Sequence, residues 1–157
     1  MSESPVTHAT FAIERVYPAP PARVFAAWAS ADEKARWIGC HPDWRTVESS
    51  MDFRVGGREI SRNQTPGGEI HAVETWYHDI VPGERIIYSY QMSVGDTRIS
   101  VSLVTIELHA AEGGTRLVFT EQGAFLDADA DSTQREGGTG TGLDRLGEML
   151  EAELAAV

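Results

Sequence analysis

Positive charge is scarce in this chain. Its 157 residues include 13 lysines and arginines against 24 aspartates and glutamates, which gives a formal net charge of −11. A chain of this charge repels phosphate backbones and anionic lipid surfaces unless its basic residues gather locally. The sequence contains no basic stripe. We therefore expect no nucleic-acid partner and no attraction to an anionic membrane.

The chain has only one cysteine and no long apolar run. A single cysteine, Cys40, cannot form an internal disulfide. The absence of any run of about 18 apolar residues predicts no membrane insertion. The first ten residues lack the basic start and apolar core of a secretory signal. These absences favour a cytoplasmic protein. Hydrophobic residues make up 41% of the chain in a mixed pattern, which predicts a flexible N-terminus over residues 1–9 and one domain over residues 10–157.

The five histidines show no spacing typical of a zinc site. His71 and His78 are seven residues apart on one expected strand, so a regular pleat places them on opposite faces. Cys40 and His41 put a thiol beside an imidazole, a pairing used by catalytic nucleophiles. Adjacent side chains rarely point at each other, however, and no third orienting group is evident. We predict a loop cysteine without catalytic role, no metal site and no cofactor.

Two other stretches resemble ligand loops only in part. Asp127, Asp129 and Asp131 have the first three spacings of a calcium loop, but Ser132 stands where that loop needs glycine. The glycine-rich stretch Gly137–Gly142 is not followed by the lysine of a phosphate-binding loop. We interpret the first as a solvated acidic loop and the second as a close-packed or open helix start.

The clearest helical pattern lies in Thr133–Ala156. Four leucines at spacings of three, four and four residues form one apolar stripe: Leu143, Leu146, Leu150 and Leu154. The glycines before them each cost a helix about 1 kcal/mol relative to alanine. Whether Gly137–Gly142 is helix or loop is therefore left open, and Phe125–Arg135 before it is expected to be an acidic loop.

Alternating apolar residues between turn signals predict seven strands. They are Thr10–Tyr17, Trp44–Ser49, Met51–Asn63, Glu69–Val81, Arg85–Val94, Thr97–Leu108 and Thr115–Gln122. Two short helices are expected after the first strand, one starting at Pro20-Pro21 and one over Ala31–Trp37. Gly56-Gly57 indicates a bulge or close backbone approach, and a change of apolar parity between Leu103 and Val104 indicates a second bulge.

This order of elements predicts an α+β domain. A curved antiparallel sheet of about six to seven strands would wrap around the long C-terminal helix, because the apolar stripe of that helix needs an apolar surface to cover it. A strongly curved sheet tends to leave space between its concave face and the helix.

Five short motifs occur in order along the chain. They are R-V-Y with A-P at 15–20, V-F-A-A-W with A-R-W-I-G at 24–39, D-F-R-V-G-G at 52–57, I-V-P-G-E-R-I at 80–86 and G-T-R-L at 114–117. Together they resemble the START-like, helix-grip superfamily, and within it the single-domain relatives of the activator of the heat-shock protein 90 ATPase. The resemblance runs from about Phe11 to Leu154. It implies a helix-grip fold with a ligand cavity between sheet and helix.

Strand parity identifies one candidate face. Three sets of alternate residues, placed on the concave side partly by pattern and partly by the resemblance, are His71, Val73, Thr75 and Tyr77; Ile86, Tyr88, Tyr90 and Met92; and Leu117, Phe119 and Glu121. Polar groups are numerous for a filled core, and buried polar groups need partners. The number of polar groups favours a cavity over a filled core, and a filled core is the alternative interpretation. The opposite parity leaves Ile70 and Trp76 outside, where a helix or a partner subunit would have to cover them.

We predict that the protein binds a small, mostly apolar or aromatic molecule. The expected contacts are Trp37, Val73, Thr75, Tyr77, Tyr88, Tyr90, Met92, Phe119, Glu121 and Leu143. The tyrosines and Glu121 would orient the ligand, and the apolar residues would form walls. Two alternatives follow from the resemblance: an enzyme of the polyketide cyclase or hydrolase type with Glu121 as acid and base, and a co-chaperone that stimulates the heat-shock protein 90 ATPase. A homodimer is a further expected partner arrangement.

Overall fold

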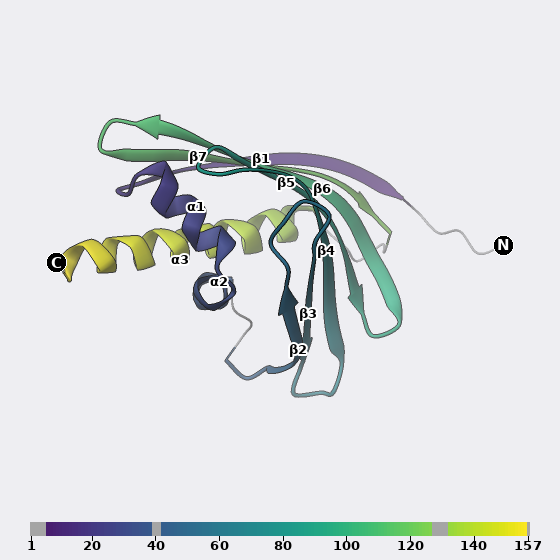
Figure 1. The fold of residues 1–157 in the computed structure, drawn as a ribbon. Helices are drawn as coiled ribbons and strands as arrows, with labels where there is room; N and C mark the ends of the chain where they lie inside the picture. The colour runs from purple at the N-terminus through teal and green to yellow at the C-terminus, as the bar shows by residue number, and fades with distance from the viewer. Residues whose placement is uncertain (1–5, 39–41, 127–131, 157) are drawn as a thin grey trace.

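The computed structural model describes residues 6–38, 42–126 and 132–156. The elements are β1 Thr7–Tyr17, α1 Pro21–Ala29, α2 Ala31–Trp37, β2 Arg45–Met51, β3 Arg58–Gln64, β4 Ile70–Val81, β5 Arg85–Val94, β6 Thr97–Ala111, β7 Gly114–Phe125 and α3 Ser132–Ala155. One seven-stranded antiparallel sheet has the order β1-β7-β6-β5-β4-β3-β2. Figure 1 shows it curving around α3, with α1 and α2 on the same side. The predicted α+β helix-grip architecture is confirmed.

The short helices after β1 follow from local sequence. α1 starts at Pro21, a position where the missing N–H breaks no helical hydrogen bond. α2 is capped by Ser30, whose hydroxyl accepts a hydrogen bond from the backbone N–H of Glu33 at 3.2 Å. The N–H of Ser30 still bonds the carbonyl of Ala26 in α1. The two helices therefore join at one residue without a loop.

β1 forms one edge of the sheet and pairs with the last strand, β7. It pairs with β7 over its full length, from Thr7 opposite Phe125 to Tyr17 opposite Thr115, and begins three residues earlier than predicted. The inward side chains of β1, β6 and β7 pack with the helices in one core: Phe11, Ile13, Tyr17, Val104, Ile106, Leu108, Leu117 and Phe119.

Two glycines dock the chain onto β4. The predicted strand Met51–Asn63 starts only at Arg58, and the residues before it form a turn. In that turn the N–H of Gly56 donates to the carbonyl of Tyr77 at 2.8 Å, and the carbonyl of Gly57 accepts from the N–H of Tyr77 at 3.0 Å. A Cβ at Gly57 would lie 2.1 Å from a backbone oxygen. The predicted close backbone approach is present, but as a turn.

β6 keeps one parity along its length, so the bulge predicted between Leu103 and Val104 is wrong. Ser100, Ser102 and Val104 are all buried, whereas Val101 and Leu103 are 43% and 40% exposed. The register shift of β5 against β6 lies near the other end of the pair. The physical reason is that the two serines face inward to meet a buried charged cluster, which forces the apolar residues between and beside them outward.

The outer face of β4 carries Trp76, as predicted from parity. Its ring is covered in part by Arg58, the residue opposite it on β3, whose guanidinium lies 5.3 Å from the ring centroid. Cover for this tryptophan therefore comes from a neighbouring strand. Ile70 at the start of β4 is likewise only half-exposed.

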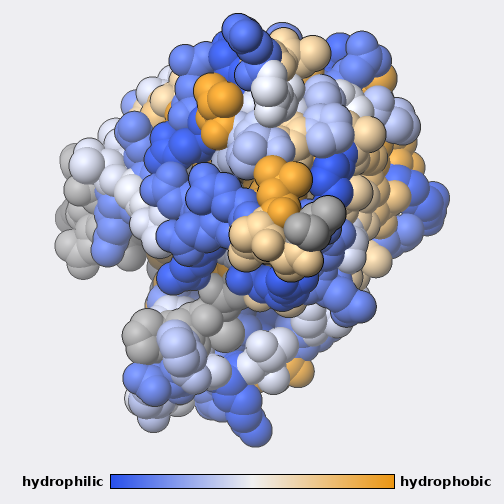
Figure 2. All heavy atoms as spheres, turned by 90° about the vertical axis from the view of Figure 1, so that its left-hand side faces the viewer, coloured by the Kyte–Doolittle hydropathy of each residue, from blue (hydrophilic) through white to orange (hydrophobic). Residues whose placement is uncertain are grey.

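α3 is one continuous helix that includes the glycine-rich stretch and the end of the predicted acidic loop. Leu143, Leu146 and Leu150 are buried as predicted, but Leu154 is 52% exposed. The last turn of α3 projects beyond the strands in Figure 1. The surface around this end of the molecule is mostly hydrophilic, with small separate apolar groups (Figure 2). The leucine stripe thus ends where sheet cover ends.

Glycines bring α3 close to β1. The hydroxyl of Tyr17 donates a hydrogen bond to the carbonyl of Leu143 at 2.8 Å. A Cβ at Gly147 would lie 3.2 Å from the Tyr17 ring, and one at Gly140 would lie 3.3 Å from the guanidinium of Arg15. These contacts compensate for the low helix propensity of glycine, because a larger residue would push the helix away from the strand.

Replacing Gly137 by alanine should stabilise the fold. A Cβ there meets no heavy atom within 4 Å, and alanine loses less backbone entropy in a helix, so we expect the free energy of unfolding to rise by about 0.5–1 kcal/mol. Urea unfolding measures the change. The contrasting variant is Gly114→Ala, where a Cβ would lie 1.9 Å from the carbonyl oxygen of Tyr17 and stability should fall. A stability loss in Gly137→Ala would contradict the helical start of α3.

Candidate functional site

A cavity of about 840 Å³ lies between the concave face of the sheet and α3. Its apolar lining comes from all three helices, β5–β7 and the segment before β2: Trp28, Trp37, Ile38, Trp44, Tyr88, Met92, Val94, Ile99, Phe119 and Leu143. Its polar lining is His71, Gln134, Arg135, Thr139, Thr141 and Arg145. This size and this mixture are typical of small-molecule sites.

α3 projects little into the cavity because two of its lining residues are glycines. Gly138 and Gly142 both line the cavity, one turn apart on the same helix face. A Cβ at Gly138 would meet no heavy atom within 4 Å, and one at Gly142 would come no closer than 3.7 Å to the carbonyl oxygen of Trp37. The predicted association of the glycine-rich helix start with open space therefore agrees with the geometry.

Aromatic rings line the opposite wall. The rings of Trp28 and Trp37 meet edge to face with centroids 4.6 Å apart, and Phe119 lies 6.5 Å from Trp28. The indole N–H of Trp37 donates to the carbonyl of Ala27 at 3.1 Å. The indole N–H of Trp28 is buried and has no acceptor within the described part of the chain. A buried donor without a partner costs about 1–3 kcal/mol, and this nitrogen is shielded from the cavity as well as from the outer solvent.

A charged cluster lies directly behind the cavity wall. Glu121 on β7 is 1% exposed, and its Oε2 accepts hydrogen bonds from the Tyr90 hydroxyl and the Ser102 hydroxyl, both at 2.7 Å. The guanidinium of Arg135 lies 3.4 Å from the same oxygen. These three donors all meet Oε2, while Oε1 has no partner among the described residues, so they offset part of the cost of burying the carboxylate.

Arg135 joins the helix start to the sheet. One terminal nitrogen donates to the Tyr90 hydroxyl at 2.8 Å, and the other donates to the Ser100 hydroxyl at 2.9 Å. Its guanidinium also lies 5.1 Å from the ring centroid of Phe125. Because Arg135 lines the cavity while Glu121 lies behind it, the arginine is the part of this cluster that a ligand would meet.

The hydroxyls of Tyr88 and Tyr90 stay protonated over the ordinary pH range. Burial raises the pKa of Tyr90, and the neighbouring carboxylate of Glu121 raises it further. Burial likewise holds the pKa of Tyr88 well above its usual value, with added effects of Tyr90 and Glu121. Both phenols therefore remain hydrogen-bond donors, Tyr88 at the cavity wall and Tyr90 behind it.

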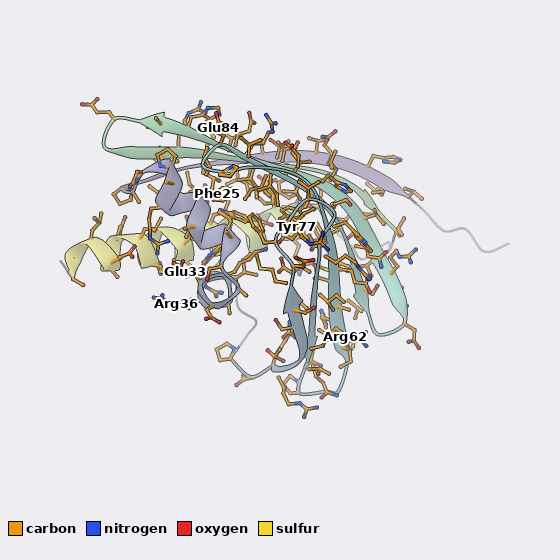
Figure 3. The ribbon with its side chains drawn as sticks, viewed as in Figure 1. Phe25, Glu33, Arg36, Arg62, Tyr77 and Glu84 are labelled. Atoms are coloured by element: carbon orange, nitrogen blue, oxygen red, sulfur yellow. The ribbon has the colours of Figure 1, made fainter. Side chains whose placement is uncertain are left out.

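A second buried polar cluster holds α2 against the sheet. Lys34 donates to Glu59 at 2.7 Å and to the Tyr77 hydroxyl at 3.2 Å, and that hydroxyl also bonds Glu59. Burial raises the pKa of Tyr77, and the carboxylate of Glu59 adds to the effect. Figure 3 shows Tyr77 on the concave side of the sheet, toward α2. Its hydroxyl is therefore committed to anchoring the helix that carries Trp37.

Half of the predicted ligand contacts line the cavity: Trp37, Tyr88, Met92, Phe119 and Leu143. The others lie outside its lining: Val73, Thr75, Tyr77, Tyr90 and Glu121. Tyr90 and Glu121 support Arg135 from behind, and Tyr77 anchors α2. Val73 packs against the core, and Thr75 is 5% exposed. Ligand contact stays a prediction for the first group, and packing roles describe the second group better.

Several residues of the site escape sequence reasoning. Arg135 stands in a segment that its acidic neighbours mark as a loop, and Ser100 and Ser102 stand on the less apolar parity of their strand. Trp44, whose ring centroid lies 4.6 Å from that of His71, precedes β2. A usable signal was the inward parity of Glu121, because a buried carboxylate requires donors and thereby favours an arginine and hydroxyls nearby.

The remaining predictions concern the histidines, the ligand-loop motifs and membrane insertion. His71 lines the cavity, whereas His78 is exposed and bonds Ser89, which agrees with their predicted opposite faces. Cys40-His41 and the aspartates at 127–131 lie outside the described residues. Among the residues the structure describes, no three metal-ligating side chains cluster. Within the same ranges, no helix has the length and hydrophobicity needed to cross a membrane.

A curved antiparallel sheet that wraps around a C-terminal helix, with a cavity between them, defines the helix-grip fold. A family model described as "Activator of Hsp90 ATPase homolog 1-like protein" matches residues 18–151. The chain belongs to this family, as the sequence motifs predicted. No curated protein matches the chain.

Solved structures agree with this assignment. An uncharacterised protein from Rhizobium leguminosarum is 46% identical, with a TM-score of 0.90 over 96% of this chain and 99% of that one. The Mll3558 protein from Rhizobium loti is 44% identical, with a TM-score of 0.85 over 92% and 98%. An AHSA1-like protein from Aeromonas hydrophila shares the fold at 22% identity, with a TM-score of 0.67 over 92% and 94%.

The tyrosines should resist ionisation in the folded protein. Burial raises the pKa of all four: Tyr17, Tyr77, Tyr88 and Tyr90. Unfolded phenols ionise at a pH of about 10, so the stability linked to these groups is intact below that pH and is lost progressively above it. We expect tyrosinate absorbance to stay low at pH 10.5 in the native protein and to rise in urea to about three quarters of its full value. Native tyrosinate at that pH would contradict the burial described.

Removing the cation of the buried cluster should be costly. Arg135→Met leaves Glu121 without its charged partner, and we expect a loss of about 3–5 kcal/mol. Adding Glu121→Gln should restore part of it, because no uncompensated charge then remains. Urea unfolding of the single and double variants gives the coupling. The exposed pair Arg116–Glu14 serves as control: Arg116→Met should cost less than about 1 kcal/mol. Additive losses for Arg135 and Glu121 would contradict the coupling.

Proposed function

We propose that this protein binds a small, mostly apolar or aromatic ligand in the cavity between the sheet and α3. The observation that carries the proposal is the cavity of about 840 Å³, whose wall is formed largely by aromatic and aliphatic side chains. The cavity is open to solvent on part of its surface, and a concave, mainly apolar lining with a few polar groups is typical of small-molecule sites. The cytoplasmic location and the homodimer expected from the sequence remain predictions that accompany this proposal.

The walls suit a flat apolar ligand. Trp28, Trp37 and Phe119 are almost fully buried, and Trp28 makes ring contacts with the other two, so this part of the wall is ordered before a ligand arrives. A preordered aromatic site loses little side-chain entropy on binding. Tyr88 supplies a phenol at the wall that burial keeps protonated by raising its pKa. The site therefore combines a rigid apolar surface with a small number of hydrogen-bond donors.

The geometry gives less support to the enzymatic alternative. A residue that acts as general acid and base must lie within hydrogen-bond distance, about 2.6–3.2 Å, of the substrate atom that gains or loses the proton, or be connected to it through one water. Glu121 is 1% exposed and is held by Tyr90, Ser102 and Arg135 behind the lining. Its arrangement is that of a group that positions Arg135. The co-chaperone alternative rests on the family match and would use the outer surface of the molecule.

Filling the cavity should abolish ligand binding. Gly138→Phe places a ring in the cavity, whereas Gly137→Phe adds the same ring at the preceding residue, which lies outside the cavity lining, and neither Cβ meets a heavy atom within 4 Å. We expect N-phenyl-1-naphthylamine, a neutral fluorescent probe, to bind the parent chain and Gly137→Phe. Its affinity for Gly138→Phe should fall at least about tenfold. Fluorescence titration measures this.

Two outcomes would contradict the proposal. One is the absence of probe binding to the parent chain. The other is equal loss in both variants, which would show that the probe binds elsewhere. A heat-shock protein 90 ATPase rate that rises with the parent chain and equally with Gly138→Phe would favour the co-chaperone alternative, because it would be independent of the cavity.

A further inference from the structure

The charged groups of the cavity wall are arginines. Arg135 and Arg145 line it, and no aspartate or glutamate does among the residues the structure describes. This is unexpected in a chain with 24 acidic and 13 basic side chains. A concave apolar surface with charges of one sign strengthens their field and favours a ligand group of the opposite sign.

The two arginines differ in what they are free to do. The terminal nitrogens of Arg135 are engaged with Tyr90, Ser100 and Glu121, and its charge is compensated by that carboxylate. Arg145 is exposed and makes no hydrogen bond or ion pair within the described ranges of the chain. The adjacent acid, Asp144, is bound to Arg15 at 2.7 Å. Arg145 is therefore the basic group of the wall with free donors.

The helix places Arg145 at one end of the glycine-bearing face. Gly138, Gly142 and Arg145 follow at spacings of four and three, so they lie in one row. Side chains on a helix lean toward its N-terminus. An Arg145 side chain that follows this tendency extends toward Gly142, which also lines the cavity and has no side chain to block the way. A ligand body could lie along the two glycines with its head at the arginine.

We propose that the ligand is a monocarboxylic acid with an apolar or aromatic body, whose carboxylate is bound by the guanidinium of Arg145. This inference rests on the proposed function. The planar donors of arginine match a carboxylate in a two-point hydrogen bond. A single free guanidinium suits one negative charge.

Matched acids and amides test this inference. 1-Naphthaleneacetic acid and its amide have the same aromatic body, and decanoic acid and decanamide have the same aliphatic one. Calorimetric titration at pH 7.5 should show at least one acid binding the parent chain about tenfold more tightly than its amide. The pair that shows the preference identifies the body as aromatic or aliphatic.

Variants assign the preference to Arg145. In Arg145→Gln the acid should lose about tenfold in affinity, while the amide changes by less than about twofold. Arg145→Lys should keep part of the preference, because it retains the charge and loses the two-point geometry. The control is Arg36→Gln, which removes an exposed arginine of α2 (Figure 3) that also makes no ion pair within the described chain and lies outside the cavity lining.

Each contrary result has a distinct meaning. Equal affinity for acid and amide, or binding of N-phenyl-1-naphthylamine without binding of either acid, overturns the carboxylate assignment and leaves cavity binding intact. A preference for the acid that survives in Arg145→Gln overturns the role of Arg145. Failure of the neutral probe to bind the parent chain overturns the proposed function itself, and this inference with it.

Discussion

The burial of one carboxylate organises this fold. Glu121 lies beneath the start of α3 at 1% exposure, and a charge so placed requires a cation and further donors. Arg135 supplies the cation from the helix, and Ser102 and Tyr90 supply hydroxyls from neighbouring strands. The inward parity of β6 follows from this need, and so does the position of the first turn of α3. One electrostatic requirement thus connects β5, β6, β7 and α3.

The cavity exists because α3 is anchored at two places and has glycines between these anchors. Its first turn is tied to the sheet by Arg135, and its middle lies against Tyr17 of β1, whose hydroxyl bonds the carbonyl of Leu143. The residues between these anchors include Gly138 and Gly142, which contribute no side chains to fill the space. The two anchors fix the position of α3, and the glycines between them leave space between this part of the helix and the sheet. The space lies beside the packed hydrophobic core.

Sequence pattern predicted the parts of the fold in which one parity is plainly more apolar than the other. That holds for the inward faces of β4, β5 and β7 and for three of the four leucines of α3. It failed in β6, because Val101 and Leu103 make the outward parity the more apolar one locally, and only the distant Glu121 explains the inward serines. Local pattern also assigns Arg135 to a loop, since its helical state depends on tertiary contacts. Half of the expected cavity residues lie outside the lining for the same reason. Contacts between strands decide which side chains reach the cavity, and the sequence of a single strand does not contain them.

The pairing of β1 with β7 has a consequence for synthesis of the chain. Thr7–Tyr17 leaves the ribosome first, yet its partner Gly114–Phe125 is made last but one among the elements. At about 5–20 residues per second, roughly 5–20 s pass between the two. During that interval Phe11 and Ile13 have no strand beside them, while β2 to β6 can pair in order as each emerges. The first strand to be made is thus the last to join the sheet, and the nascent chain carries an unpaired apolar segment until it does.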